Sequence, residues 1–77
     1  MSDYSIDQAI LSFVGKRWRK IAMVISRVAD AMGTDLPQGD EGCQVVARHI
    51  EGLVRDGRLV AQGDTKDWRF SEVRQPN

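Results

Sequence analysis

Three stretches of this chain repeat apolar residues at intervals of three and four, the spacing that places side chains on one face of an α-helix. A glycine follows each stretch, at positions 15, 33 and 57, where a left-handed residue commonly ends a helix. The three stretches therefore predict amphipathic helices at about residues 6–14, 18–32 and 41–56.

Polar residues mark the expected helix starts. Ser5 and Gln8 have the S-x-x-Q spacing of a capping box, and Asp40 is placed to cap the third helix. Trp18 opens the second apolar stripe, and we expect its ring to lie in the core. Between the second and third helices, "GTDLPQGDEG" has three glycines and a proline and predicts a loop.

The last part of the chain predicts a β-hairpin at about residues 58–74, because "RLVAQ" and "WRFSEVR" are strand-like and flank the turn sequence "GDTKD". Trp68 and Phe70 alternate so that both lie on one face of the hairpin. Leu59 and Ala61 on the other strand can lie opposite them. We expect these four side chains to attach the hairpin to the core.

Three helices followed by a hairpin resemble the winged helix-turn-helix superfamily. Leu53, Gly57 and Leu59 form an "L-x-x-x-G-x-L" pattern that is similar to the junction between the third helix and the wing in that superfamily. The resemblance implies one α+β domain over residues 1–77, with three winged-helix-like helices and a C-terminal hairpin wing. Some families of this superfamily bind DNA and others bind only protein.

A narrower resemblance is to a bacterial domain of unknown function that usually lies at the C-terminus of longer proteins. It is carried by "WRKIAMVI" and "GDTKDWRFSEVR", with matching residues Trp18, Gly63, Asp64, Arg69, Glu72, Val73 and Arg74. This resemblance implies a fold and no activity.

Composition places the chain among ordinary soluble globular domains. Its 77 residues include 42% hydrophobic and 29% charged side chains, without an apolar run of about 18 residues that could span a membrane. The first residues, "MSDYSIDQ", lack the basic start of a secretory signal, and Cys43, the single cysteine, excludes an internal disulfide. We therefore expect a cytoplasmic protein that does not associate with membranes.

Eleven basic and eleven acidic side chains cancel, so DNA binding would require these charges to be segregated. Residues 1–32 hold five basic and three acidic side chains, whereas residues 33–64 hold three and six. The basic excess therefore precedes the third helix, which is the element that enters the major groove in DNA-binding helix-turn-helix proteins.

The outward face of the third helix is expected to consist of Gln44, Arg48, Glu51 and Arg55. Gln and Arg are suitable for reading adenine and guanine, but Glu51 is unfavourable near phosphates. Glu51 is also spaced to form ion pairs with both arginines, so this face can instead be a solvated surface with intrahelical ion pairs. If DNA is bound, we expect base contacts from Gln44, Arg48 and Arg55. Phosphate contacts are then expected from Arg17, Arg19, Lys20, Lys66 and Arg69.

No arrangement for catalysis or metal binding is evident in the sequence. Cys43 and His49 are six residues apart, which places them about 240° apart around a helix, too far to share a metal ion. The lone histidine has no evident nucleophile partner. We expect Cys43 in the core, His49 at its edge, and neither catalysis nor a cofactor or small-molecule substrate.

Protein association is the competing function. Several apolar residues lie off or at the edge of the core stripes and can form a patch for a partner or a second copy of the chain. They are Ile6, Leu11, Met23, Val24 and Val45. Zero net charge and Glu51 favour protein association or self-association, and DNA binding is the alternative.

Overall fold

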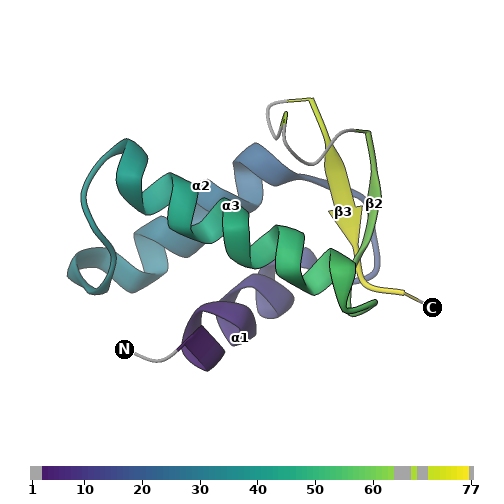
Figure 1. Cartoon of the computed structure of the whole chain (residues 1–77), viewed down its shortest axis with the longest axis horizontal. Helices are drawn as coiled ribbons and strands as arrows, with labels where there is room; N and C mark the ends of the chain where they lie inside the picture. Colours follow the sequence, from purple (N-terminus) through teal and green to yellow (C-terminus); the bar gives the residue numbers. More distant parts are fainter. Residues whose placement is uncertain (1–2, 64–66, 68–69, 77) are drawn as a thin grey trace.

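The computed structural model describes residues 3–63, 67 and 70–76. Within these residues the elements follow one another in the order α1, β1, α2, η1, α3, β2, β3, where η1 is a single turn of 3₁₀ helix (Figure 1). Their bounds are α1 Asp3–Val14, β1 Arg19–Lys20, α2 Ile21–Met32, η1 Gly33–Asp35, α3 Asp40–Arg55, β2 Val60–Gln62 and β3 Glu72–Arg74. The predicted α+β class is confirmed.

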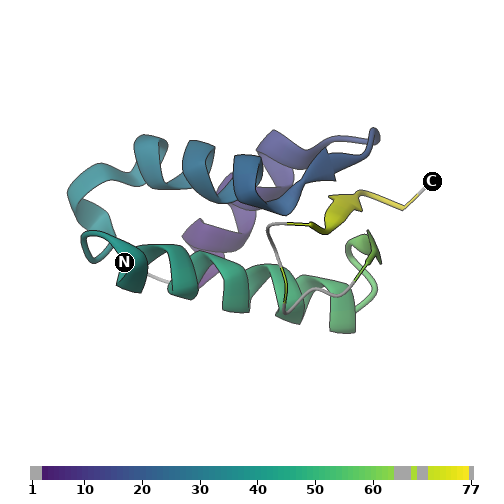
Figure 2. The ribbon, with the colours of Figure 1, turned by 90° about the horizontal axis from the view of Figure 1, so that it is seen from above.

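The described strands form one antiparallel sheet in the order β1-β3-β2. Val73 of β3 lies opposite Arg19 of β1 and Ala61 of β2. Figure 2 shows α2 and β1 on one side of the molecule and α3 and β2 on the other, with β3 between them. The hairpin expected at the C-terminal end is therefore confirmed, and β1 is an additional strand at its outer edge.

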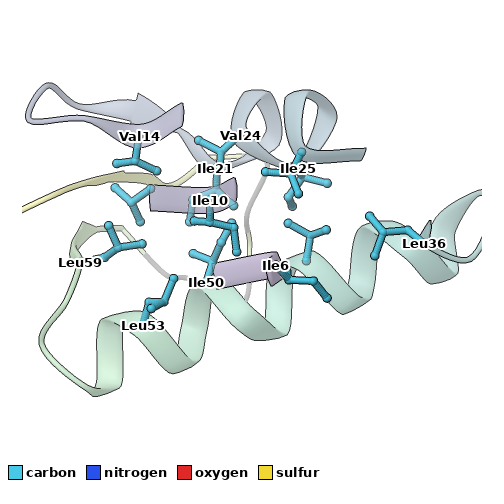
Figure 3. Packing of buried hydrophobic residues seen from close by; sticks show 13 residues of the cluster. Ile6, Ile10, Val14, Ile21, Val24, Ile25, Leu36, Ile50, Leu53 and Leu59 are labelled. Carbon is cyan, nitrogen blue, oxygen red and sulfur yellow. The ribbon is translucent and has the colours of Figure 1, made fainter. Parts of the chain in front are cut away.

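All three helices contribute to a single core. Ile10 of α1 lies between α2 and α3, close to Ile21 and Ile50 (Figure 3). Leu59 and Val73 close the core at the sheet end, and Leu36 lies at the other end, after η1. The buried hydrophobic residues are Ile6, Ile10, Val14, Ile21, Val24, Ile25, Val28, Leu36, Val46, Ile50, Leu53, Leu59 and Val73.

Both predicted helix caps are wrong. The first helix begins at Asp3, so Ser5 lies inside α1 and is not its cap. The third helix begins at Asp40, so Asp40 is its first residue and not its cap. Gly39 holds the cap position, and no side chain forms a cap hydrogen bond there. Asp40 and Glu41 instead occupy the first turn of α3, where the helix dipole favours negative charge.

The second helix begins three residues later than predicted, at Ile21, because the residues before it join the sheet. Arg19 and Lys20 pair with β3, and the backbone N–H of Ile21 donates to the carbonyl oxygen of Ser71 at 3.0 Å. Trp18 therefore lies before a strand and not at the head of a helix. Its ring is 37% exposed, so its predicted place in the core is wrong.

The packing predicted for the hairpin is also wrong at Phe70, which is 82% exposed. Phe70 precedes β3 and lies in a turn, where its backbone N–H donates to the carbonyl oxygen of Asp67 at 3.0 Å. The buried hydroxyl of Ser71 donates to the same oxygen at 2.9 Å. Trp68, which was expected beside Phe70, lies outside the described residues.

The junction between α3 and β2 follows the predicted pattern. Gly57 has a φ of +81°, and its N–H donates to the carbonyl oxygen of Val54 at 3.1 Å. The N–H of Arg58 donates to the carbonyl oxygen of Leu53 at 2.9 Å, which completes a Schellman motif. Leu53 and Leu59 are both buried, so the exposed turn between them is anchored in the core on both sides.

Replacing Gly57 with alanine is expected to destabilise the domain by about 1 to 2 kcal/mol, because a left-handed backbone is unfavourable for a residue with a Cβ. A Cβ at this position meets no atom within 4 Å, so the cost comes from backbone conformation alone. Urea denaturation of Gly57→Ala and Gly57→Asn measures it. Asparagine tolerates this conformation better, so equal losses for the two variants would contradict the explanation.

Candidate binding surfaces

The outward face of α3 carries the three residues predicted for base contacts. Gln44, Arg48 and Arg55 are all exposed, on the opposite side from the buried stripe, whereas Glu51 is half-buried. Neither Arg48 nor Arg55 forms an ion pair with a carboxylate among the described residues, so the pairs predicted with Glu51 are absent. Helical periodicity therefore predicted correctly that Gln44, Arg48 and Arg55 are exposed, but the predicted ion pairs with Glu51 do not form.

The basic residues around β1 form a second surface. Arg17, Arg19 and Lys20 are exposed, and their neighbour Trp18 lies under the guanidinium of Arg74, 5.0 Å from the ring centroid. This cation–π contact joins the edge of β1 to β3 and explains why Trp18 stays at the surface. The sequence did not single out Arg74 as a partner of Trp18.

The structure places these two sets of cations at opposite edges of the sheet. Arg17, Arg19 and Lys20 lie at or beside β1, next to α2, whereas α3 leads into β2 at the other edge (Figure 2). Lys66 and Arg69, which were expected to contact phosphates from the wing, lie outside the described residues. Within the described part of the chain, the predicted DNA-contacting residues therefore belong to two elements, α3 and β1, with β3 between β1 and the strand that follows α3.

A third surface lies between α1 and α2. A shallow hollow of about 200 Å³ is lined by Ser12, Phe13, Arg19, Met23 and Arg27. A second hollow, of about 310 Å³, is lined by Phe13, Arg27, Asp30 and Ala31. Met23 is 36% exposed and was predicted for an association patch, whereas Ile6 and Val24 of that patch are buried and Leu11 and Val45 are half-buried.

His49 lies at the edge of the core, as predicted, and links α3 to α1. Its Nδ1 lies 3.0 Å from Oδ1 of Asp7, and both side chains are partly buried. A hollow of about 280 Å³ beside this pair is also lined by Arg48 and Asp56. The contact joins residues 42 positions apart in the sequence, so its evident role is to hold the two helices together.

Cys43 is half-buried and packs against the core. It lines a hollow of about 360 Å³ between the end of α2 and the start of α3, away from His49. No cluster of three His, Cys, Asp or Glu side chains able to hold a metal ion occurs in residues 3–63, 67 and 70–76. The same residues contain no helix with the length and apolar character needed to cross a membrane.

No family model, curated protein or solved structure matches this chain.

Proposed function

We propose that this protein is a non-catalytic, winged-helix-like module that acts by binding another protein. The order of its elements supports the winged-helix assignment, with a strand between the first two helices and a hairpin after the third. The sheet order β1-β3-β2 supports it as well, since it adds the first strand to the outer edge of the hairpin. The resemblance to the bacterial domain of unknown function stays a prediction.

The observation that favours a protein partner is the surface between α1 and α2, where Phe13 and Met23 bring apolar area next to Arg19 and Arg27. Aromatic side chains, methionine and arginine are the residues enriched in protein–protein interfaces. A phosphate backbone, in contrast, is bound mainly through cations. A surface in which apolar side chains separate the cations is better suited to protein than to DNA.

DNA binding is the second candidate, and the outward face of α3 favours it. Gln44, Arg48 and Arg55 are exposed on the helix that would enter the major groove. The acidic residues of α3, Asp40, Glu41 and Glu51, reduce the attraction of this helix for phosphates. The cations of β1 belong to another element and are not part of the outward face of α3.

A crosslinking experiment distinguishes the two functions. Met23 and Gln44 are each replaced by the photoreactive amino acid p-benzoyl-L-phenylalanine, and each variant is irradiated in an extract of the source cells and with a random DNA duplex. We expect a discrete protein adduct from position 23 and no duplex adduct from position 44. Mass spectrometry of the adducts identifies what is bound.

Fluorescence anisotropy with the same duplex provides the control. We expect no saturable binding at low salt, because Asp40, Glu41 and Glu51 of α3 reduce its attraction for phosphates. Binding that weakens steeply with salt, together with a duplex adduct at position 44 and no protein adduct, would replace protein association by DNA binding as the function.

A further inference from the structure

We propose that the surface between α1 and α2 is a docking site for an acidic protein segment that carries apolar side chains. This inference rests on the proposed protein-binding function and specifies its surface and the chemistry of its partner. We call the surface the α1–α2 groove and define it by the residues that line its two hollows, Ser12, Phe13, Arg19, Met23, Arg27, Asp30 and Ala31.

The two hollows of the α1–α2 groove lie next to each other along α2. They share Phe13 and Arg27, so they adjoin at these side chains. Met23, Arg27 and Ala31 follow one another at intervals of four residues and therefore lie along one face of α2. At 1.5 Å of rise per residue, this face spans about 12 Å, which is the length of about two helical turns in a partner.

The packing of the core explains why this face is left open. The buried positions of α2 are Ile21, Val24, Ile25 and Val28, which face α1 and α3. Phe13 is only half-buried, because it packs against the edge of the core and still lines the groove. The rest of the described chain therefore leaves parts of Phe13, Met23 and Ala31 uncovered, and we call these three side chains the apolar floor of the groove.

Charge identifies the kind of segment that fits. Arg19 and Arg27 line the groove, and Lys16, Arg17 and Lys20 lie within three residues of Arg19. None of these five cations forms an ion pair with a described carboxylate. Asp30 is the one acidic residue among those that line the groove. Two lining cations against one lining carboxylate leave a net positive charge along the groove, which complements an acidic partner.

An amphipathic helix with acidic flanks would cover the apolar side chains of the groove and also complement its positive charge. Its apolar residues would cover Phe13 and Met23, while its carboxylates would reach Arg19 and Arg27. Methionine adapts its shape to different apolar neighbours, and an arginine binds a carboxylate through two parallel hydrogen bonds. A nucleic acid would use the cations but would leave the apolar floor exposed to water.

The test uses a designed peptide as a probe. It has 14 residues, with leucine and phenylalanine at helical spacing and glutamate elsewhere, and it is titrated into the full-length ¹⁵N-labelled protein. We expect amide shifts concentrated at Phe13, Arg19, Met23 and Arg27. The matched peptide with lysine in place of glutamate should cause none of these shifts, because its charge repels the groove.

Two charge reversals provide matched variants. Arg27→Glu should weaken binding of the acidic peptide by about tenfold or more, as expected for an arginine central to an interface. Arg55→Glu makes the same change in charge on the exposed face of α3 and should leave the affinity within about twofold. Circular dichroism confirms that both variants are folded.

The proposal is overturned if the acidic peptide does not bind, if its shifts lie outside the α1–α2 groove, or if the two reversals weaken binding equally. Shifts in the groove with a random DNA duplex but not with the peptide would assign it to nucleic acid. The crosslinking experiment separates this failure from that of the proposed function. A protein adduct at position 44 and none at position 23 would remove the groove but keep protein association.

Discussion

Replacing Gly42 with alanine is expected to destabilise the domain by about 1 to 3 kcal/mol, because the added methyl group has no space. Gly42 is buried on α3, where a Cβ would overlap the carbonyl oxygen of Pro37. The Cβ is fixed to the backbone of the helix and the oxygen belongs to the backbone of the loop, so either the helix or the loop before it must move. Urea denaturation followed by circular dichroism measures the loss as a lower midpoint with an unchanged slope.

Gly52→Ala is the matched control, in the same helix. A Cβ at Gly52 meets no atom within 4 Å outside the helix backbone that surrounds it, and its φ is not positive. Alanine should therefore stabilise the domain by about 0.5 to 1 kcal/mol, because it loses less conformational freedom in a helix than glycine. Changes of the same sign in both variants would show that the close approach of Pro37 to α3 is not the cause.

The two glycines show what helical periodicity can and cannot predict. A glycine within a helix has the same intrinsic cost at either position, so the sequence does not distinguish Gly42 from Gly52. The difference depends on the loop that contains Pro37, which turns back against the first turns of α3. Such a contact depends on the path of the loop, which the apolar stripes do not specify.

The helices were largely predictable because their signal is local. Residues three and four positions apart determine which face of a helix is apolar, and Val46, Ile50 and Leu53, which have this spacing in the predicted helix 41–56, are buried. The same periodicity correctly predicted that Gln44, Arg48 and Arg55 are exposed. Their ends were less predictable, since the caps expected at Ser5 and Asp40 fall inside the helices.

The sheet was only partly predictable because its pairing is not local. Arg19 and Lys20 form a strand through hydrogen bonds with residues more than 50 positions later. A strand of two basic residues has no apolar alternation of its own that could reveal it. The displacement of Trp18 to the surface follows from the same pairing, as does its contact with Arg74.

The α1–α2 groove was missed because two helices form it together. The sequence indicates Met23 as an apolar residue off the core stripe, but Phe13 lines the groove from a different helix. One signal was present in the sequence, since Met23, Arg27 and Ala31 share a helical face away from the buried stripe of α2. This face becomes part of a groove only because tertiary packing brings Phe13 and Arg19 alongside it.

Replacing Ile50 with alanine is expected to destabilise the domain by about 2 to 5 kcal/mol, the usual cost of removing a large side chain from a packed core. Ile50 is 1% exposed and lies next to α1 in the centre of the core (Figure 3). At about 0.05 to 0.15 kcal/mol per residue, a domain of this size has a total stability of only about 4 to 12 kcal/mol. The variant should therefore show a much lower melting temperature or be unfolded.

Gln44→Ala on the exposed face of α3 should change the stability by no more than about 0.5 kcal/mol, because the side chain of Gln44 is already exposed to solvent in the folded domain. Thermal unfolding of both variants tests the assignment of the two faces. Similar losses would show that the outward face is also covered and is not available to a partner. A large loss confined to Ile50→Ala would mean that Gln44, Arg48 and Arg55 can be substituted to test DNA binding without unfolding the domain.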